Sequence, residues 1–235
     1  MGRAFEFRKG RKIKRWSSMA KIFTKIVREI TICAKEGGID PKSNSKLRAV
    51  IQNAKSVNMP KVNIERALKK AIYNTADTYK KIIFEGYAPH GVALLIEATT
   101  NNNNRTVANI RSYFNKYGGT LGVSGSVEYI FEHKCSFKFY PKDLNLEELE
   151  LELIDYGIDE FFTIGEYAYV YASFDKFGAI QQKLENNSIN ILSTEFERIP
   201  LNTIELNDLD KEDVNKLIYI IEEDDDVQSV FSNLK

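Results

Sequence analysis

Near the N-terminus, hydrophobic residues recur every three or four positions, which is the spacing of amphipathic helices. Between Lys21 and Lys35 they fall on one arc of a helical projection, and Gly37-Gly38 ends the segment. A second helix is expected after Ser43-Asn44-Ser45, and Pro60 suits the first turn of a third. These three helices predict a small bundle that ends near residues 73–77.

Beyond the bundle, the period of the hydrophobic pattern shortens toward two, as it does in β-strands. Strands are expected at 81–87 and 92–98, followed by a helix at 104–117, a glycine-rich loop at 118–125 and a strand at 127–131. A helix at 211–222 and a strand at 227–231 close the chain and complete this set. The domain that these elements form is therefore expected to be discontinuous.

The intervening segment has an order of its own. Residues 135–199 read as strand (135–140), helix (146–156), two strands (161–164 and 168–172), helix (174–186) and strand (191–199). This is the β-α-β-β-α-β order of ferredoxin-like folds. The predicted fold class is α+β: an N-terminal three-helix domain with a basic arm at 1–76, followed by two ferredoxin-like α+β domains. The first of these is 77–132 plus 200–235, and the last, 133–199, is inserted in it.

Charge divides the chain into two parts of opposite sign. Residues 1–76 contain 19 Lys and Arg against 5 Asp and Glu, whereas the remainder contains 14 against 28, so a net charge of +14 is joined to one of −14. Phosphates attract clustered cations and release counterions on contact, so the basic part is expected to bind nucleic acid. An ordinary solvated surface mixes both signs, and so unbalanced a field has a cost in self-repulsion.

The candidate nucleic-acid-binding residues lie in the arm and on the polar side of the first helix. The arm lacks apolar periodicity and is expected to order on a partner. Its tryptophan is expected either to stack on unpaired bases or to pack on the bundle. A start rich in Arg and Lys is also typical of mitochondrial transit peptides. The candidates are Arg8, Lys9, Arg11, Lys12, Lys14, Arg15, Trp16, Lys21, Lys25, Arg28 and Lys35.

Two further features suggest contacts. The second and third helices, joined at 58–60, resemble a helix-turn-helix, although any helical hairpin shows this pattern. An asparagine run at 101–104 precedes Arg105, and one or two of these amides would cap the helix that begins there. Asn101, Asn103 and Arg105 are candidates for contact with a partner, and Arg105 could equally pair with an acid of its own domain. Because the acidic part repels phosphate, we expect it to contact a protein, or to hold a fixed distance between the basic part and a functional centre.

Nothing in the chain has the spacing of a catalytic or metal site. The glycine-rich loop follows a helix and precedes a strand, which reverses the phosphate-binding order. The five consecutive acids at 222–226 point apart, so a solvated acidic edge is expected there. His90 and His133 lack a recognisable nucleophile or a cysteine at ligand spacing. We expect no enzymatic activity, no cofactor and no metal.

Composition limits the compartment and the assembly. No stretch reaches 18 uninterrupted apolar residues, so no membrane partner is expected. Cys33 and Cys135 are far apart in the sequence, which favours free thiols and a cytoplasmic location. No heptad repeat argues for an obligate oligomer, and we expect a monomer.

Long stretches of the chain resemble one family, the YebC-type proteins described as transcriptional regulators or translational activators. The matching stretches are KIFTKIVREITICAKEGGIDPKSNSKLRAVIQNAKSVNMPKVNIERALKKA at 21–71, FEGYAPHGVALLIEATTNNNNRTVANIRSYFNKYGGTLGVSGSVEYIF at 84–131, and IPLNTIEL with LIYIIEEDDDVQSVFSN near the C-terminus. The resemblance implies a helical domain plus two α+β domains and no established catalytic residues. Most members begin with Gly-His-Ser-Lys-Trp, whereas this chain has Gly2-Arg3-Ala4-Phe5-Glu6, so no role of that histidine is transferred.

Two functions follow from the resemblance, and the charge pattern does not separate them. The first is a non-enzymatic, DNA-binding regulator of transcription. The alternative is a translational activator that binds ribosomal RNA or the ribosome. A groove-fitting helix would favour DNA, whereas a basic arm with aromatic residues favours unpaired bases in RNA. An enzyme with an unrecognised site is a third and weaker hypothesis, because no catalytic constellation is present.

Overall fold

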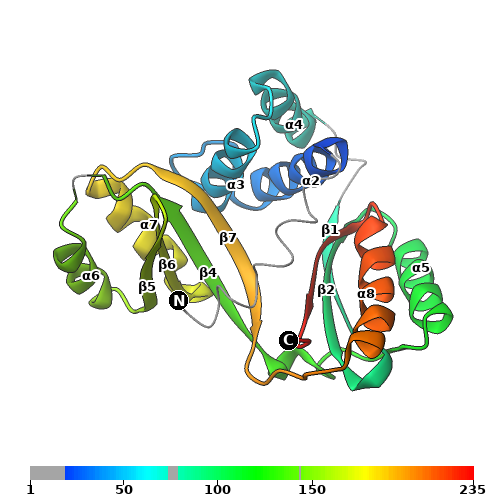
Figure 1. Ribbon diagram of the computed structural model, residues 1–235. Helices are drawn as coiled ribbons and strands as arrows, with labels where there is room; N and C mark the ends of the chain where they lie inside the picture. The colour runs from blue at the N-terminus through cyan, green and yellow to red at the C-terminus, as the bar shows by residue number, and fades with distance from the viewer. Residues whose placement is uncertain (1–18, 74–78, 143) are drawn as a thin grey trace. The chain divides into compact units, whose positions relative to one another are not determined.

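The computed structural model describes residues 19–73, 79–142 and 144–235. The fold is α+β, with three N-terminal helices and two four-stranded sheets in the part described, which confirms the predicted class (Figure 1). The chain forms two compact units. The first unit consists of the described residues up to Tyr73 together with His133–Glu197. The second consists of the described residues from 79 to 132 together with Arg198–Lys235.

Three helices open the first unit: α2 (Met19–Gly37), α3 (Ser45–Ser56) and α4 (Lys61–Tyr73). Their apolar faces meet in one core, to which α2 contributes Ile26, Ile30 and Cys33. The Asn44 side chain joins the first two helices, because it accepts the Leu47 N–H at 3.0 Å and donates to the Cys33 carbonyl at 2.7 Å. A Cβ at Gly37 would lie 2.6 Å from that amide, so this position requires glycine.

The same unit contains an antiparallel sheet with the strand order β5-β6-β4-β7. Helices α6 and α7 supply side chains to a single core with strands β4 and β6, so both cover the same face of the sheet. The elements follow in the predicted β-α-β-β-α-β order. Their bounds are β4 (Phe131–Phe139), α6 (Leu146–Ile154), β5 (Ile158–Ile164), β6 (Tyr167–Ser173), α7 (Phe177–Asn186) and β7 (Ile191–Pro200).

Helix α3 docks on the edge of this sheet. The Asn53 amide donates to the Thr194 carbonyl at 2.5 Å and accepts the Thr194 N–H at 2.9 Å, as a neighbouring strand would. Arg48 pairs with Glu185 of α7 at 2.8 Å, and Ala49 belongs to the core of the sheet. The otherwise open edge strand β7 is thereby covered, which removes a site for unwanted strand pairing.

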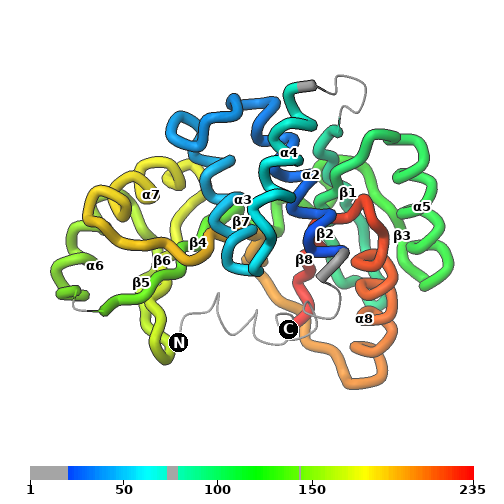
Figure 2. The backbone as a smooth tube through the Cα atoms, turned by 90° about the horizontal axis from the view of Figure 1, so that it is seen from above, coloured from blue at the N-terminus to red at the C-terminus, as the bar shows by residue number. Residues whose placement is uncertain are grey.

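The second unit is a sheet of order β3-β1-β2-β8 with antiparallel neighbours. Helices α5 and α8 lie side by side over one face (Figures 1 and 2), where residues such as Ile110, Phe114 and Leu217 meet the strands. The bounds are β1 (Lys80–Tyr87), β2 (Ala93–Thr100), α5 (Asn103–Lys116), β3 (Thr120–Leu121), α8 (Asp208–Glu223) and β8 (Val227–Ser232).

The strand predicted at 127–131 is wrong. Glu128–Ile130 forms a 3₁₀ turn before β4 begins, and the third strand of this sheet is instead the two-residue β3. The physical reason is a buried carboxylate. Glu85 of β1 accepts the backbone N–H groups of Val127 and Glu128, so these amides are not available to pair with a strand.

Candidate nucleic-acid interface

Only some of the predicted nucleic-acid-binding residues lie in the part of the chain that the structure describes. Arg8, Lys9, Arg11, Lys12, Lys14, Arg15 and Trp16 lie outside the described residues. The remaining candidates are all on α2. All four have contacts; Lys35 is exposed near the end of the helix, whereas Lys21, Lys25 and Arg28 are half-buried.

Helix α2 is enclosed more completely than its sequence pattern indicates. Ile26 and Ile30 are buried on the predicted apolar arc, but Thr31 and Ile32 are buried as well, with exposed fractions of 2% and 4%. The prediction of one buried apolar face and one exposed polar face is therefore wrong for the C-terminal half of α2. The Thr31 hydroxyl donates to the Val27 carbonyl at 2.8 Å, so a polar side chain is accommodated there without a lost hydrogen bond.

The exposed cations of residues 19–73 lie mostly on α3, on α4 and in the turns beside them. On α4, the second helix of the pair that resembles a helix-turn-helix, Lys61, Arg66 and Lys69 are exposed, whereas Asn63 and Lys70 are half-buried. Only three acids are exposed in this range, at 36, 40 and 65. An excess of cations is therefore presented to solvent, as phosphate binding requires. The exposed cations are Lys35, Lys42, Lys46, Lys55, Lys61, Arg66 and Lys69.

The asparagine run has a structural role at one position. Asn102 is the N-cap of α5, and its side chain accepts the Arg105 N–H at 3.1 Å. Asn101 and Asn103 are exposed. The Arg105 guanidinium donates to Asp226 at 2.6 Å, so it forms the pair within its own unit that its charge allowed.

The acidic run at 222–226 is only partly a solvated edge. Asp226 is 3% exposed and accepts hydrogen bonds from Thr100, Arg105 and Thr106. Asp224 accepts the Tyr113 hydroxyl at 2.9 Å. Burial and this hydrogen bond to a carboxylate raise the pKa of Tyr113 to about 12. The two acids therefore hold the C-terminal end of α8 against α5, and the prediction of a solvated edge is corrected for both.

Removing the Asp226 carboxylate is expected to destabilise the protein more than removing its cationic partner. Asp226→Ala leaves the buried Thr100 hydroxyl without its acceptor, whereas the Thr106 hydroxyl keeps the Asn102 carbonyl at 3.1 Å, and we expect a loss of about 2 kcal/mol in the free energy of unfolding. Arg105→Ala removes a half-exposed partner and should cost below about 1 kcal/mol. Urea unfolding measures both, with the exposed Asp225→Ala as control. Equal losses for the two variants would contradict this account.

The glycine-rich loop binds a carboxylate of its own chain. Glu85 is 3% exposed and accepts the N–H groups of Gly125, Val127 and Glu128 at 2.7, 2.7 and 2.8 Å. Burial acts to raise the pKa of Glu85, but these three donors and the nearby Arg198 outweigh it and lower the pKa below 4.5. The loop therefore resembles an anion site, filled by a side chain. The sequence analysis missed this contact, although a glutamate inside an apolar strand was a signal for it.

No metal site is found within the described part of the chain. Its His, Cys, Asp and Glu residues form no group of three that could hold an ion. His90 lies 3.7 Å from both Asp210 and Asp213, and His133 stacks on Phe174 with the ring centroids 4.0 Å apart. Both cysteines are buried free thiols. None of the helices described is long and apolar enough to cross a membrane.

Two family models match the chain. The model described as "TACO1/YebC protein N-terminal domain" matches residues 3–73, and that described as "TACO1/YebC second and third domain" matches residues 79–234. A crystal structure of a conserved hypothetical protein from Aquifex aeolicus is similar, with a TM-score of 0.79 and 36% identity. The match covers 94% of this chain and 91% of that one.

Similar sequences come from several bacteria. Proteins from Flavobacterium johnsoniae, Parabacteroides distasonis and Wolinella succinogenes are 58%, 53% and 46% identical to this chain. Each comparison covers 100% of this chain and 97% or more of the relative. All three relatives bear the name "Probable transcriptional regulatory protein".

Proposed function

The chain belongs to the TACO1/YebC family, and on that premise we propose that it is a non-enzymatic regulator of gene expression that binds nucleic acid in the cytoplasm. The observation that carries the proposal is the charge of the helical module, defined as residues 19–73. It exposes seven cations against three acids, and an interface with phosphates is polar and positive in the same way. The names of the relatives describe regulators and no reaction.

Duplex DNA is the first candidate target. It is supported by the names of the curated relatives and by the three exposed cations of α4, which follows α3 after a short turn. In that turn, Asn58 has a φ of 58° and Pro60 precedes the first residue of α4. A helix that enters a major groove reads base edges with such a row of exposed side chains.

RNA is the second candidate target, and a different feature favours it. Helix α5 of the other unit presents amides and cations but no acid. Amide groups both donate and accept, so they match the 2′-hydroxyl that distinguishes RNA from DNA. On this alternative, the protein acts as a translational activator at the ribosome.

Sedimentation of cell lysate through sucrose distinguishes the two targets. A regulator of transcription is expected with chromosomal DNA and should be released by DNase. A translational activator is expected with ribosomal particles and should be released by RNase or by about 0.5 M salt, because electrostatic contacts weaken steeply with salt. Recovery of the protein at the top of the gradient, whatever the salt concentration, would overturn the proposal that it binds nucleic acid.

A further inference from the structure

Helix α5 differs in charge from the rest of the acidic part of the chain. It carries Arg105, Arg111 and Lys116 and no Asp or Glu. Each of the other α-helices that the structure describes after residue 79 contains at least one acid. The net charge of −14 beyond residue 76 is thus not spread evenly, and this helix forms a local region that does not repel phosphate.

The outward side of α5 consists of hydrogen-bonding groups that have no partner within the described residues. Arg111, Ser112 and Asn115 are exposed, and their side chains form no hydrogen bond or ion pair there. Lys116 lies only against the ring of Tyr117, with its Nζ 5.6 Å from the centroid. Arg105 differs, because Asp226 already holds it.

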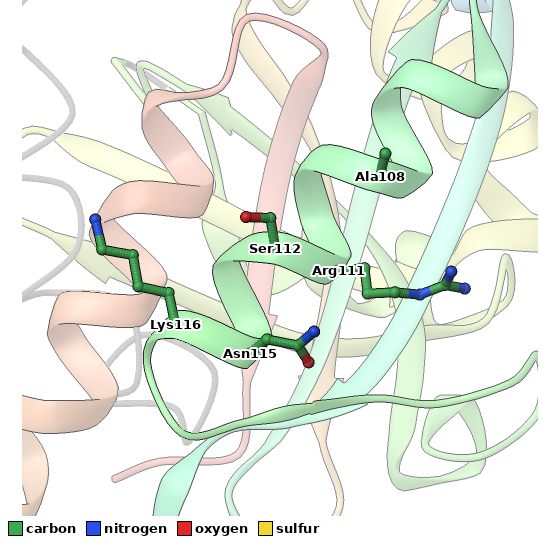
Figure 3. A pocket seen from close by; sticks show the side chains of 5 residues that line it. All are labelled: Ala108, Arg111, Ser112, Asn115 and Lys116. Atoms are coloured by element: carbon green, nitrogen blue, oxygen red, sulfur yellow. The ribbon is translucent and has the colours of Figure 1, made fainter.

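These side chains lie together on one open, solvent-facing side of a single helix, formed by Ala108, Arg111, Ser112, Asn115 and Lys116. Figure 3 shows Arg111 and Lys116 extending to opposite sides of α5, with Ser112 and Asn115 between them. The two cations are five residues apart, which separates them by about 7.5 Å along the helix axis. Two cations with amide and hydroxyl groups between them suit an extended polyanion that also carries hydroxyl groups.

We propose that this side of α5, the α5 surface (Asn104, Ala108, Arg111, Ser112, Asn115 and Lys116), binds the sugar-phosphate backbone of an RNA strand. The inference rests on the proposed function and names the chemistry of one of its targets. It also revises the expectation that the acidic part does not contact nucleic acid. That expectation followed from the total charge of residues 77–235, whereas the fold decides which charges share one surface.

The composition of the α5 surface favours nucleic acid over protein. The cores of protein–protein interfaces are enriched in aromatic and large apolar side chains and depleted of charge. The α5 surface offers one alanine and otherwise only polar or cationic groups. Interfaces with nucleic acid are more polar and more positive than those between proteins.

The neighbouring helix favours one RNA strand over a DNA groove. A helix in the major groove has a phosphate backbone on each flank. On one flank of α5 lies α8, whose exposed side chains include Asp208, Glu212 and Asp213. These acids would repel the second backbone, so the α5 surface suits a single backbone. The amides of Asn104 and Asn115 can donate to and accept from ribose hydroxyls, which DNA lacks.

Charge reversal on the α5 surface tests the inference in the full-length chain. Binding is measured by fluorescence anisotropy with three probes: an unstructured 20-nucleotide RNA, the DNA strand of the same sequence, and the DNA duplex. Arg111→Glu with Lys116→Glu is expected to weaken RNA binding about tenfold at 0.1 M salt. The slope of log affinity against log salt should fall by about 1.4, because each single-strand phosphate contact contributes about 0.7.

Two further variants complete the test, the first as a charge-matched control and the second to separate RNA from DNA. Lys211→Glu with Lys216→Glu makes the same change in net charge on α8 and should weaken RNA binding less than about twofold, because charges beyond a Debye length are screened. Asn104→Ala with Asn115→Ala should weaken RNA binding about threefold and leave single-strand DNA binding unchanged, because only ribose offers the 2′-hydroxyl. Circular dichroism and thermal melting establish that each variant is folded.

The outcomes separate this inference from the proposed function. If the α5 variants bind RNA as tightly as the wild type, the α5 inference is overturned. The proposed function then still stands, provided that a variant of the helical module loses binding. A loss for duplex DNA as large as that for RNA overturns the assignment to RNA. If the wild type binds none of the three probes, the proposed function itself fails.

Discussion

Neutralising the exposed cations of the helical module is expected to reduce nucleic-acid affinity about a hundredfold at 0.1 M salt. The variant changes Lys55, Lys61, Arg66 and Lys69 to Gln in the full-length chain. All four side chains are exposed, so none should be needed for folding. Each phosphate contact to a duplex adds about 0.9 to the slope of log affinity against log salt, so two lost contacts alone give roughly this factor. Anisotropy titrations across a salt series measure both quantities.

A control with equal charge keeps this prediction specific. Lys142, Lys176, Lys216 and Lys235 are exposed on the acidic parts of the chain, and changing all four to Gln alters the net charge by the same amount. This control should bind within about threefold of the wild type, because diffuse charge is screened by salt. If both quadruple variants lose affinity equally, net charge and not the helical module governs binding.

Removing the Glu85 carboxylate is expected to cost about 4 kcal/mol of unfolding free energy. Glu85→Ala leaves the buried Val127 N–H and the neighbouring donors of Gly125 and Glu128 without their acceptor. Hydrogen bonds to a charged group contribute about 1.5–3 kcal/mol each, and water recovers part of that loss once the loop opens. Urea denaturation measures the change, and the exposed Glu205→Gln serves as a control near zero. A loss below about 1 kcal/mol would show that the glycine-rich loop keeps its conformation without the Glu85 carboxylate.

The same carboxylate should make the protein sensitive to acid. The pKa of Glu85 is lower in the folded protein than its ordinary value of 4.5, so its contribution is complete above pH 4.5 and is lost as pH falls through the folded pKa. Burial raises the pKa of Glu197 to about 8, which acts in the opposite direction and removes stability as pH rises from about 4.5 to 8. Comparing Glu85→Gln with the wild type at each pH cancels the Glu197 contribution. As pH falls below 4.5, the Glu85→Gln variant should therefore lose less stability than the wild type.

Local pattern was sufficient for the helices and for most of the strands. A helix of α3 or α4 length repeats its apolar positions three or four times, and its ends carry their own signals, such as Asn44 before α3 and Asn102 before α5. The residues that interact in this way are only a few positions apart, so the local sequence is sufficient to predict them. The charge division between the two parts of the chain is likewise a property of composition alone.

The partners of the polar residues could not be obtained in this way. Thr106 meets Asp226 from 120 positions away, and Glu85 meets Val127 from 42 positions away. No spacing rule connects such pairs, because long loops must close before residues so far apart in the sequence can meet. The strand predicted at 127–131 failed for this reason, since a distant carboxylate takes the amides that a strand would use.

The sequence by itself determined the α+β class, the order of most elements and the basic character of the first 76 residues, because periodicity, capping and composition are local properties. Only the tertiary structure decided which cations reach solvent. Lys21, Lys25 and Arg28 are half-buried on α2, whereas the exposed cations cluster on α3 and α4 and an acid-free surface appears on α5. Exposure depends on which faces pack together, and that packing is fixed by contacts between residues far apart in the chain.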